Sequence, residues 1–311
     1  MNFSSKTKNE ILKNDVSKRC CQIALLSGFI RAGGSAIVRG GHIGFSVSGE
    51  EKVLNFIAKI VKSVYGINLE ITADELNAKR CNCQVASKES TLLMLDTKIV
   101  TLSDDGVGIN LNIDYMFEEK DCCKRSFIIG AFLGSGTVTI PDLKNSKSTS
   151  YHFEIVFSGE DTARQFCELF SSLGFMPKMI SRKETQVVYL NSAEAVNDAL
   201  TFVGAINASL ELTDVIMKRE IKNNLNRSQN CEMNNLNKLI DASIMDREAI
   251  QVIDKILGLD SLSEALQIVA RARLDNPEGS LAEISENLGI SKSCLSHRIR
   301  KLREIAKNLQ N

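Results

Sequence analysis

The residues best suited to chemistry lie near the C-terminus, where hydroxyl groups and one imidazole alternate with cationic side chains. The set comprises Lys292, Ser293, Ser296, His297, Arg298, Arg300, Lys301 and Arg303. Short polar side chains can form hydrogen bonds with base edges, and arginine and lysine can bind backbone phosphates. This combination predicts that the segment binds double-stranded DNA.

A second cationic segment lies between residues 217 and 238, which include seven asparagines. Arginine, lysine and asparagine all bind phosphate oxygens. Lys218, Lys222 and Arg227 are therefore candidate contacts with the DNA backbone. The alternative is a solvated, partly helical linker, and the composition leaves both interpretations open.

No set of residues is arranged for catalysis. His297 has no serine, cysteine or carboxylate partner at a catalytic spacing, and His42 and His152 are isolated in the sequence. We therefore expect a protein that is not an enzyme and that uses no cofactor and no small-molecule substrate.

The nine cysteines also lack the spacing of a metal site. They include two adjacent pairs, Cys20-Cys21 and Cys122-Cys123, but no C-x-x-C pair and no zinc-finger pattern. We expect reduced, mostly buried thiols and no bound metal.

The overall composition limits the class of protein. The 38 basic and 38 acidic residues balance, so a nucleic-acid site must be a local basic surface. Tryptophan is absent and aromatics make up 5%, which argues against an aromatic-lined groove for carbohydrate or single strands. The longest uncharged apolar stretch, residues 127–141, is too short to span a bilayer, and residues 1–22 do not resemble a signal peptide. We expect a cytoplasmic, nucleoid-associated protein.

An internal repeat organises the first 220 residues. The segment FSVSGEE at 45–51 aligns with IVFSGED at 155–161, an offset of 110. Upstream the offset is 102, which places Cys20-Cys21 on Cys122-Cys123 and Gly28 on Gly130. One polar insertion at about residues 144–150 accounts for the difference. The repeat predicts a tandem duplication with copies at residues 1–118 and 119–222.

Each copy has the pattern of a helix, two strands, a helix, two strands and a helix. The expected elements are a helix at 19–32 or 124–133, strands at 36–47 or 137–157, an amphipathic helix, strands at 69–86 or 178–190, and a helix at 91–98 or 193–203. Alternating apolar residues predict the strands, and an apolar stripe predicts the middle helix. The fold class is therefore α+β.

The first helix of each copy contains a nonapeptide rich in small residues, LSGFIRAGG at 26–34 and IIGAFLGSG at 128–136. Gly28 and Ala32, like Gly130 and Gly134, lie four residues apart on one helical face, where two helix backbones can approach closely. Both nonapeptides resemble the motif of the LAGLIDADG homing endonucleases. The resemblance implies a pseudo-symmetric (αββαββα)2 body whose two sheets form a saddle.

The nucleases of that family hold a divalent metal with an acid at the eighth position of each motif, where this sequence has Gly33 and Ser135. Residues 27–36 and 126–140 contain no carboxylate at all. A hard cation has no oxygen ligand there. A metal-dependent homing-type endonuclease is therefore the least favoured interpretation, and we expect the fold to serve as a scaffold, with contact between saddle and DNA left open.

The C-terminal residues 247–311 have the pattern of a helix-turn-helix domain, which follows a basic, asparagine-rich linker or helix at 223–246. Two expected capping boxes, Ser261 with Glu264 and Ser280 with Glu283, would begin the first two of its last three helices, and Gly289 suits the tight turn. In the last helix the expected inward stripe is Leu295, Ile299, Leu302 and either Ile305 or Ala306. The expected outward face then carries Lys292, Ser293, Ser296, His297 and Arg300, with Arg298, Lys301 and Arg303 on its flanks. Ser285 lies in the middle of the first helix of the pair, where many such motifs have alanine.

A duplicated LAGLIDADG-like domain without its acids, followed by a helix-turn-helix with the segment SKSCLSHR at 291–298, resembles the WhiA family of bacterial regulators. The resemblance implies a DNA-binding transcription factor involved in cell division and chromosome segregation, or in sporulation. Its partners would be double-stranded DNA and other regulatory or division proteins, with no role at a membrane. The alternative is a protein-interaction scaffold in cell division for which DNA binding is secondary.

Overall fold

The computed structural model describes residues 2–74, 77, 80–103, 106–142 and 150–310. Residue contacts divide the chain into two units, Met1–Arg219 and Glu220–Asn311. Each unit has its own buried apolar core. Among the helices of the described residues, none combines the length and the apolar character that a membrane span requires.

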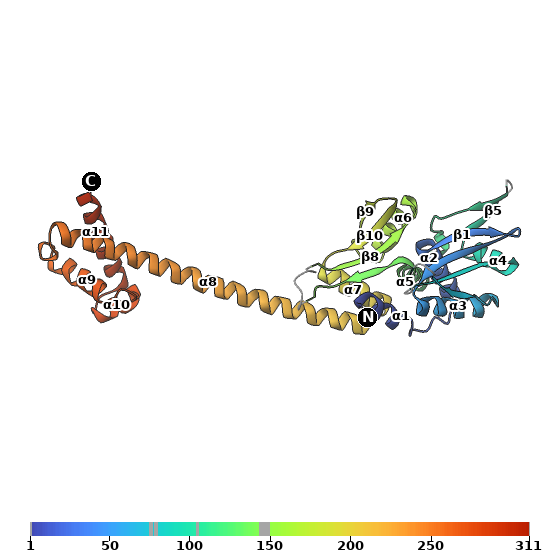
Figure 1. The fold of residues 1–311 in the computed structure, drawn as a ribbon, viewed down its shortest axis with the longest axis horizontal. Helices are drawn as coiled ribbons and strands as arrows, with labels where there is room; N and C mark the ends of the chain where they lie inside the picture. The colour runs from blue at the N-terminus through green and yellow to red at the C-terminus, as the bar shows by residue number, and fades with distance from the viewer. Residues whose placement is uncertain (1, 75–76, 78–79, 104–105, 143–149, 311) are drawn as a thin grey trace. The chain divides into compact units, whose positions relative to one another are not determined.

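The first unit contains two copies of one arrangement of helices and strands (Figure 1). The first copy consists of α2 (Arg19–Gly33), β1 (Gly34–Arg39), β2 (His42–Gly49), α3 (Glu51–Tyr65), β3 (Ile71–Ala73), β4 (Cys81–Ala86) and α4 (Lys88–Asp96). The second consists of α5 (Asp121–Ser135), β7 (Thr137–Thr139), β8 (His152–Phe157), α6 (Glu160–Ser171), β9 (Lys178–Arg182), β10 (Thr185–Leu190) and α7 (Ala193–Val203). The insertion proposed at 144–150 falls almost entirely outside the described residues.

The two sheets have the same topology. The strand orders are β1-β2-β4-β3 and β7-β8-β10-β9, and every pairing is antiparallel. Equivalent strands occupy equivalent places, so the predicted duplication and the α+β fold class are confirmed.

One face of each sheet supplies the core of the first unit. On β2 the buried side chains are Phe45 and Val47, and on β8 they are Phe153, Ile155 and Phe157. Because successive side chains of a strand point to opposite faces, the residues between them face outward. The helices cover the buried face.

Helices α2 and α5 pack against each other with almost no side chain between them. A Cβ atom on Gly28 would lie 2.1 Å from the carbonyl oxygen of Phe127, and one on Gly130 would lie 1.9 Å from that of Leu25. Further along, a Cβ on Gly33 would lie 2.7 Å from the carbonyl oxygen of Gly134. Ala32 is half-buried beside this contact. Only glycine permits these approaches.

The sequence does not predict four elements of the first unit. They are α1 (Phe3–Ile11), the hairpin of β5 (Val100–Ser103) and β6 (Gly106–Ile109), and the short helix η1 (Tyr115–Phe117). In α1 only Thr7 and Ile11 are buried, and the residues of β6 are all exposed. Neither segment shows the apolar periodicity from which an element can be predicted.

Residues 206–256 form one continuous helix, α8 (Ile206–Ile256). Gly204 and Gly258, both with positive φ, lie just outside its ends. No glycine or proline occurs between them, so no residue in the segment interrupts the helix. The basic, asparagine-rich linker or helix expected at 223–246 is part of this continuous helix.

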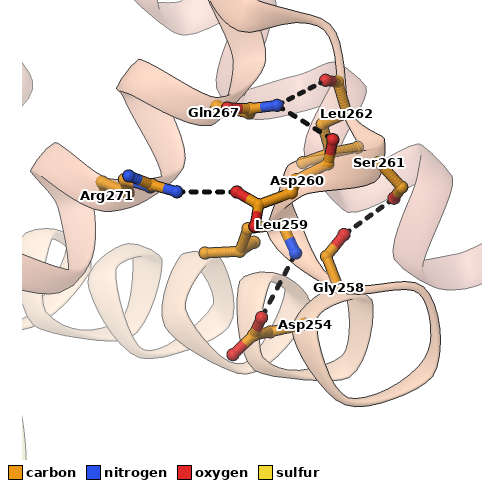
Figure 2. A network of polar contacts seen from close by, with 8 residues as sticks. All are labelled: Asp254, Gly258, Leu259, Asp260, Ser261, Leu262, Gln267 and Arg271. Carbon is orange, nitrogen blue, oxygen red and sulfur yellow. Dashed lines mark hydrogen bonds and ion pairs between the residues drawn. The ribbon is translucent and has the colours of Figure 1, made fainter.

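The second unit comprises the C-terminal part of α8, then η2 (Leu259–Ser261), α9 (Glu264–Asp275), α10 (Leu281–Asn287) and α11 (Lys292–Gln310). Figure 2 shows the polar contacts that hold the turn between α8 and α9. Asp254 Oδ1 accepts a hydrogen bond from Leu259 N, and Gln267 Nε2 donates to the carbonyl oxygens of Asp260 and Leu262.

The start of α9 corrects one prediction. The helix begins at Glu264 with Ser263 as its N-cap, while Ser261 ends η2 and donates its hydroxyl to the carbonyl oxygen of Gly258. The capping box of Ser261 and Glu264 is therefore not formed, because the short helix η2 occupies the residues before it. The box of Ser280 and Glu283 is present at the start of α10.

Candidate nucleic-acid interface

The helix-turn-helix consists of α10, a turn at Gly289 with φ of 65°, and α11. The inward stripe of α11 is Leu295, Ile299, Leu302 and Ala306, all buried, while Ile305 is half-buried. The Ser285 hydroxyl, also buried, donates to the carbonyl oxygen of Ala282 at 2.8 Å, so serine is satisfied where alanine is common. The packing therefore fixes which face of α11 points outward.

Five of the eight predicted DNA-binding residues are exposed on α11: Lys292, Ser293, His297, Arg300 and Lys301. Ser293, His297 and Arg300 follow the spacing i, i+4 and i+7 and lie on one face. Glu304 and Lys307 are exposed as well and were not among the predicted residues. The outward face therefore carries cations with one carboxylate among them.

The other three predicted residues are half-buried: Ser296, Arg298 and Arg303. Arg298 Nη1 donates to the carbonyl oxygen of Ala265 at 3.4 Å. Arg303 Nε lies 2.6 Å from Asp246 Oδ1, and its Nη2 donates to the carbonyl oxygen of Ala242. We therefore assign Arg303 to the packing of the second unit and leave it out of the proposed DNA contacts.

Asp246 joins three helices of the second unit and was missed by the sequence analysis. This carboxylate on α8 is 2% exposed and pairs with Arg303 of α11 and with Arg273 of α9. Arg273 is also buried, and its Nη1 donates to the carbonyl oxygen of Gly279. Asp246 lies one residue outside the domain predicted to begin at 247. An acid between apolar residues at helical spacing is the signal that could have indicated it.

The candidate backbone contacts of α8 are all exposed. Lys218 and Lys222 are four residues apart and share a helical face. Arg227 follows Lys218 by nine residues, which at 3.6 residues per turn places it on the opposite side. One DNA backbone can therefore contact the two lysines or Arg227, but not all three together on one straight helix.

The outward faces of the two sheets carry little charge. Within the described strands, the charged side chains on these faces are Arg39, Glu154, Lys178 and Arg182. Arg182 also pairs with Glu154 at 3.8 Å. Strong phosphate binding needs many cations. The sheets therefore offer much less electrostatic attraction to DNA than α11 does.

A LAGLIDADG nuclease would hold its metal at one end of the α2–α5 pair. In this chain the residues at that end serve in packing. The close approach of Gly33 and Gly134 leaves no space for a side chain at residue 33. The Ser135 hydroxyl donates to the carbonyl oxygen of Val156 at 2.7 Å and accepts from Val156 N at 3.0 Å. Both positions are thus used in helix and strand packing.

Helix α1 lies against this same end. Together with α2 and α5 it lines a cavity of about 970 Å³. Lys8 Nζ is 3.4 Å from the carbonyl oxygen of Leu133, in the last turn of α5. Burial lowers the pKa of Lys8, and the carboxylate of Glu50 opposes that shift. The described residues thus place an ammonium group beside the helix end where metal chemistry would need an acid.

Arg31, at the sixth position of the first nonapeptide, is 4% exposed and has a structural role. Its guanidinium donates to the carbonyl oxygens of Thr97, Lys98 and Asn112, each at 2.9 Å. Burial lowers its pKa to about 10, and the charge of Asp114 acts in the opposite direction. These bonds hold residues 97–98 and 110–112, which lie on either side of the β5–β6 hairpin, against α2.

At the opposite end of the helix pair, the structure brings together four thiols that the sequence analysis assigned to no site. Cys20, Cys21, Cys122 and Cys123 have Sγ atoms that all lie within 4.8 Å of one another. The prediction of no metal rested on spacing within one segment, whereas this cluster combines two segments. The repeat alignment, which pairs the two sets of cysteines, is the signal that could have indicated it.

Comparison with known proteins identifies the family. The chain is 34% identical over 318 residues to a protein of Clostridium tetani named "Probable cell division protein WhiA", covering 99% of this chain and 98% of that one. It is also 34% identical to the protein of that name from Bacillus velezensis, over 100% of this chain and 98% of the relative. The chain belongs to the WhiA family. The model of the WhiA C-terminal HTH domain matches residues 225–306, and that of the WhiA LAGLIDADG-like domain matches residues 124–222.

Solved WhiA structures show the same fold. The crystal structure of full-length DUF199/WhiA from Thermatoga maritima matches with a TM-score of 0.61 at 23% identity, over 99% of both chains. The N-terminal LAGLIDADG domain of DUF199/WhiA matches with a TM-score of 0.51 at 20% identity, over 65% of this chain and 90% of that one. A duplicated LAGLIDADG-like domain with a helix-turn-helix is therefore the architecture of this WhiA chain.

Proposed function

We propose that this WhiA chain is a non-enzymatic regulator that binds duplex DNA through α11. The observation that carries the proposal is the outward face of α11, where Ser293, His297 and Arg300 are exposed beside Lys292 and Lys301 while the opposite stripe is buried. A helix of this kind places short polar groups at base edges and cations at phosphates when it enters the major groove.

Substitution of two exposed cations tests the DNA contact. Lys292→Ala and Arg300→Ala should each weaken binding to duplex DNA and reduce the slope of log affinity against log salt by about one phosphate. Lys255→Ala is the matched control, because Lys255 is also exposed but lies on α8 and not on α11. Unchanged affinity in both α11 variants across a salt series would show that the proposed face is wrong.

The absence of nuclease activity is part of the proposal. Neither Gly33 nor Ser135 supplies a carboxylate, the Ser135 hydroxyl is hydrogen-bonded to Val156, and Lys8 lies beside that end of α5. We expect supercoiled plasmid to remain intact when it is incubated with the protein and Mg²⁺. Metal-dependent nicking of the plasmid would contradict the proposed absence of nuclease activity if the Lys8→Glu or Ser135→Ala substitution changed its rate.

The outward faces of the sheets favour a role for the first unit other than strong DNA binding. Lys178→Glu combined with Arg182→Glu reverses half of the charge on these faces. We expect the doubly substituted full chain to bind duplex DNA with the affinity and salt slope of the original. A marked loss would instead show that the saddle contacts DNA directly, and an unchanged result favours a surface for other proteins.

The biological setting is proposed from the relatives, whose printed name includes cell division. A DNA-binding regulator of division would act at the nucleoid, as a transcription factor or in chromosome segregation. Cells that depend on the Lys292→Ala and Arg300→Ala double variant should show the same division defect as cells without the protein. Normal division in those cells would favour the interaction scaffold over the DNA-binding regulator.

A further inference from the structure

The four thiols at the N-terminal end of the α2–α5 pair form a cluster with the dimensions of a metal site. Two of them begin α2 and two begin α5, at equivalent positions of the two repeats. Cys20 and Cys21 have Sγ atoms 4.0 Å apart, and the Cys21 thiol donates to the carbonyl oxygen of Cys122 at 3.7 Å. All six separations between the sulfur atoms are 4.8 Å or less.

We propose that Cys20, Cys21, Cys122 and Cys123 bind one zinc ion as a tetrathiolate site that joins the two repeats. A tetrahedral zinc with bonds of about 2.3 Å to sulfur has edges of about 3.8 Å between its ligands. The observed separations exceed that edge by about 1 Å at most, which side-chain rotation within the first helical turns can remove. An iron–sulfur cluster would need more space between the thiols, because several iron and sulfide ions must fit there.

The surroundings favour thiolates. The N-cap residues of α2 and α5 form no side-chain cap hydrogen bond, and the N-terminus of each helix contributes a partial positive charge beside the thiols. Lys18 and Lys120 are the N-cap residues and add two cations, while Asp121 in the first turn of α5 adds one negative charge. Four thiolates with one zinc carry a charge of −2, and the cations and helix N-termini offset it.

The thiols differ in their access to solvent in a way that suits a loaded structural site. Cys20 is exposed and Cys122 is half-buried, whereas Cys21 and Cys123 are buried. A cavity of about 290 Å³, lined in part by Cys21 and Cys122, adjoins the cluster. A metal ion can enter by this side and then be enclosed by the two inner thiols.

The site is independent of the DNA contact and of the ancestral nuclease centre. Residues 21 and 33 are 12 residues apart on α2, so the thiols lie about 18 Å from the end at which the nuclease acids would be. The zinc site would stabilise the packing of the N-termini of α2 and α5, and the glycine contacts allow the rest of the two helices to pack closely.

Metal content of the full chain tests the proposal directly. We expect about one zinc per chain after purification under reducing conditions, and cobalt substitution should give the visible absorption of a tetrahedral thiolate complex. Cys20→Ser and Cys122→Ser should each lower zinc affinity by more than the roughly 10–100-fold that loss of a second-shell partner costs. Cys231→Ser is the control, because Cys231 is exposed like Cys20 but lies on α8. This variant should bind zinc with the affinity of the original chain.

Three outcomes would overturn the assignment. They are a chain that takes up no zinc when reconstituted, a Cys20→Ser variant that keeps its zinc, and a different ion or a Cys–Cys bond in the cluster. Because Cys20 is exposed, its serine variant should keep the circular dichroism spectrum of the original chain, so a loss of zinc there reports on ligation and not on misfolding.

Discussion

Asp246 illustrates how a single side chain decides what its neighbours can do. Arg300 and Arg303 lie three residues apart on α11, yet one is exposed and the other pairs with this buried carboxylate. The sequence shows both as arginines of a basic helix. Because Asp246 lies on α8 beside Arg303, Arg303 holds helices together, whereas Arg300 is left available to bind phosphate.

Asp246→Asn should destabilise the second unit. The substitution leaves the charge of buried Arg273 without its partner, which costs about 3–5 kcal/mol when a buried ion pair is broken. Urea unfolding of the full chain measures the effect. Asp241→Asn, an exposed acid on the same helix, should change the free energy of unfolding by less than about 0.5 kcal/mol. Equal effects of the two variants would contradict the triad.

Thiol reactivity should separate the cysteines outside the cluster. Cys231 is exposed, whereas burial raises the pKa of Cys83 to about 11. At pH 8 iodoacetamide should modify Cys231 first and leave Cys83 intact, as peptide mass spectrometry can show.

The Cys83 thiol also makes the free energy of unfolding depend on pH. In the unfolded chain Cys83 loses its proton near its ordinary pKa of 9.0, while in the folded chain it keeps the proton up to about 11. The unfolded state therefore binds fewer protons in this interval, and the free energy of unfolding falls as pH rises from about 9 to about 11. Cys83→Ala should show a smaller fall, and equal falls would mean that the thiol is accessible in the folded chain.

At the scale of elements, the glycines of α2 and α5 carry the strictest requirement. Gly28→Ala and Gly130→Ala would each place a Cβ about 2 Å from a backbone oxygen, which no rotamer change can relieve. Forced overpacking of this kind costs about 1–3 kcal/mol or more. Thermal unfolding should show a large decrease for both.

Gly49→Ala is the matched control for those variants. Its Cβ would meet only a side-chain atom, Leu54 Cδ2, at the ordinary contact distance of 3.5 Å. We expect its melting temperature to stay close to that of the original chain. If Gly28→Ala behaved like Gly49→Ala, the helices would not approach as closely as the structure shows.

Glu10 on α1 acts on the start of α8. Its carboxylate accepts hydrogen bonds from Asn207 N at 2.6 Å and Ala208 N at 3.1 Å. Loss of a cap at a helix N-terminus costs about 0.5–2 kcal/mol. Glu10→Ala should lower the stability of the first unit by that amount in chemical unfolding, whereas Glu70→Ala, an exposed acid outside any helix, should not.

The predictability of the elements follows from their burial. The closing helix of the second repeat begins and ends at the expected residues 193 and 203, because its apolar residues recur at helical spacing on a buried face. Helix α1 and the β5–β6 hairpin bury too few residues to leave such a pattern. The thiol cluster required a different step, the recognition that equivalent positions of a duplicated helix meet in space.

At the scale of the molecule, the boundary between the two units falls inside α8. Every side chain from residue 220 to residue 241 is exposed, so this part of the helix lacks the tertiary packing that supplies most helical stability in proteins. The core of the second unit takes in α8 residues such as Ile250 and Ile253, while Ala208 and Leu212 belong to the core of the first. The expected limits at 222 and 246 lie within this one helix.

Limited proteolysis should cut this segment before any other. Trypsin has sites at Lys222, Arg227 and Lys238, where the helix has no packing to protect it from local opening. We expect two resistant fragments whose mass spectra place the cuts between residues 222 and 238, each with helical circular dichroism. Early cleavage elsewhere, or rapid digestion of either fragment, would show that the units do not fold independently.

The contacts of α1 also impose an order on the making of the protein. Glu10 and Asn207 are 197 residues apart in the chain, and Lys8 and Leu133 are 125 apart. On the ribosome, α1 emerges early and must wait until α8 has begun before all its partners exist. Closing so long a loop is entropically costly. Helix α1 is thus synthesised among the first elements but packs among the last. The first unit can finish folding only after the start of α8, the helix that leads into the second unit, has been synthesised.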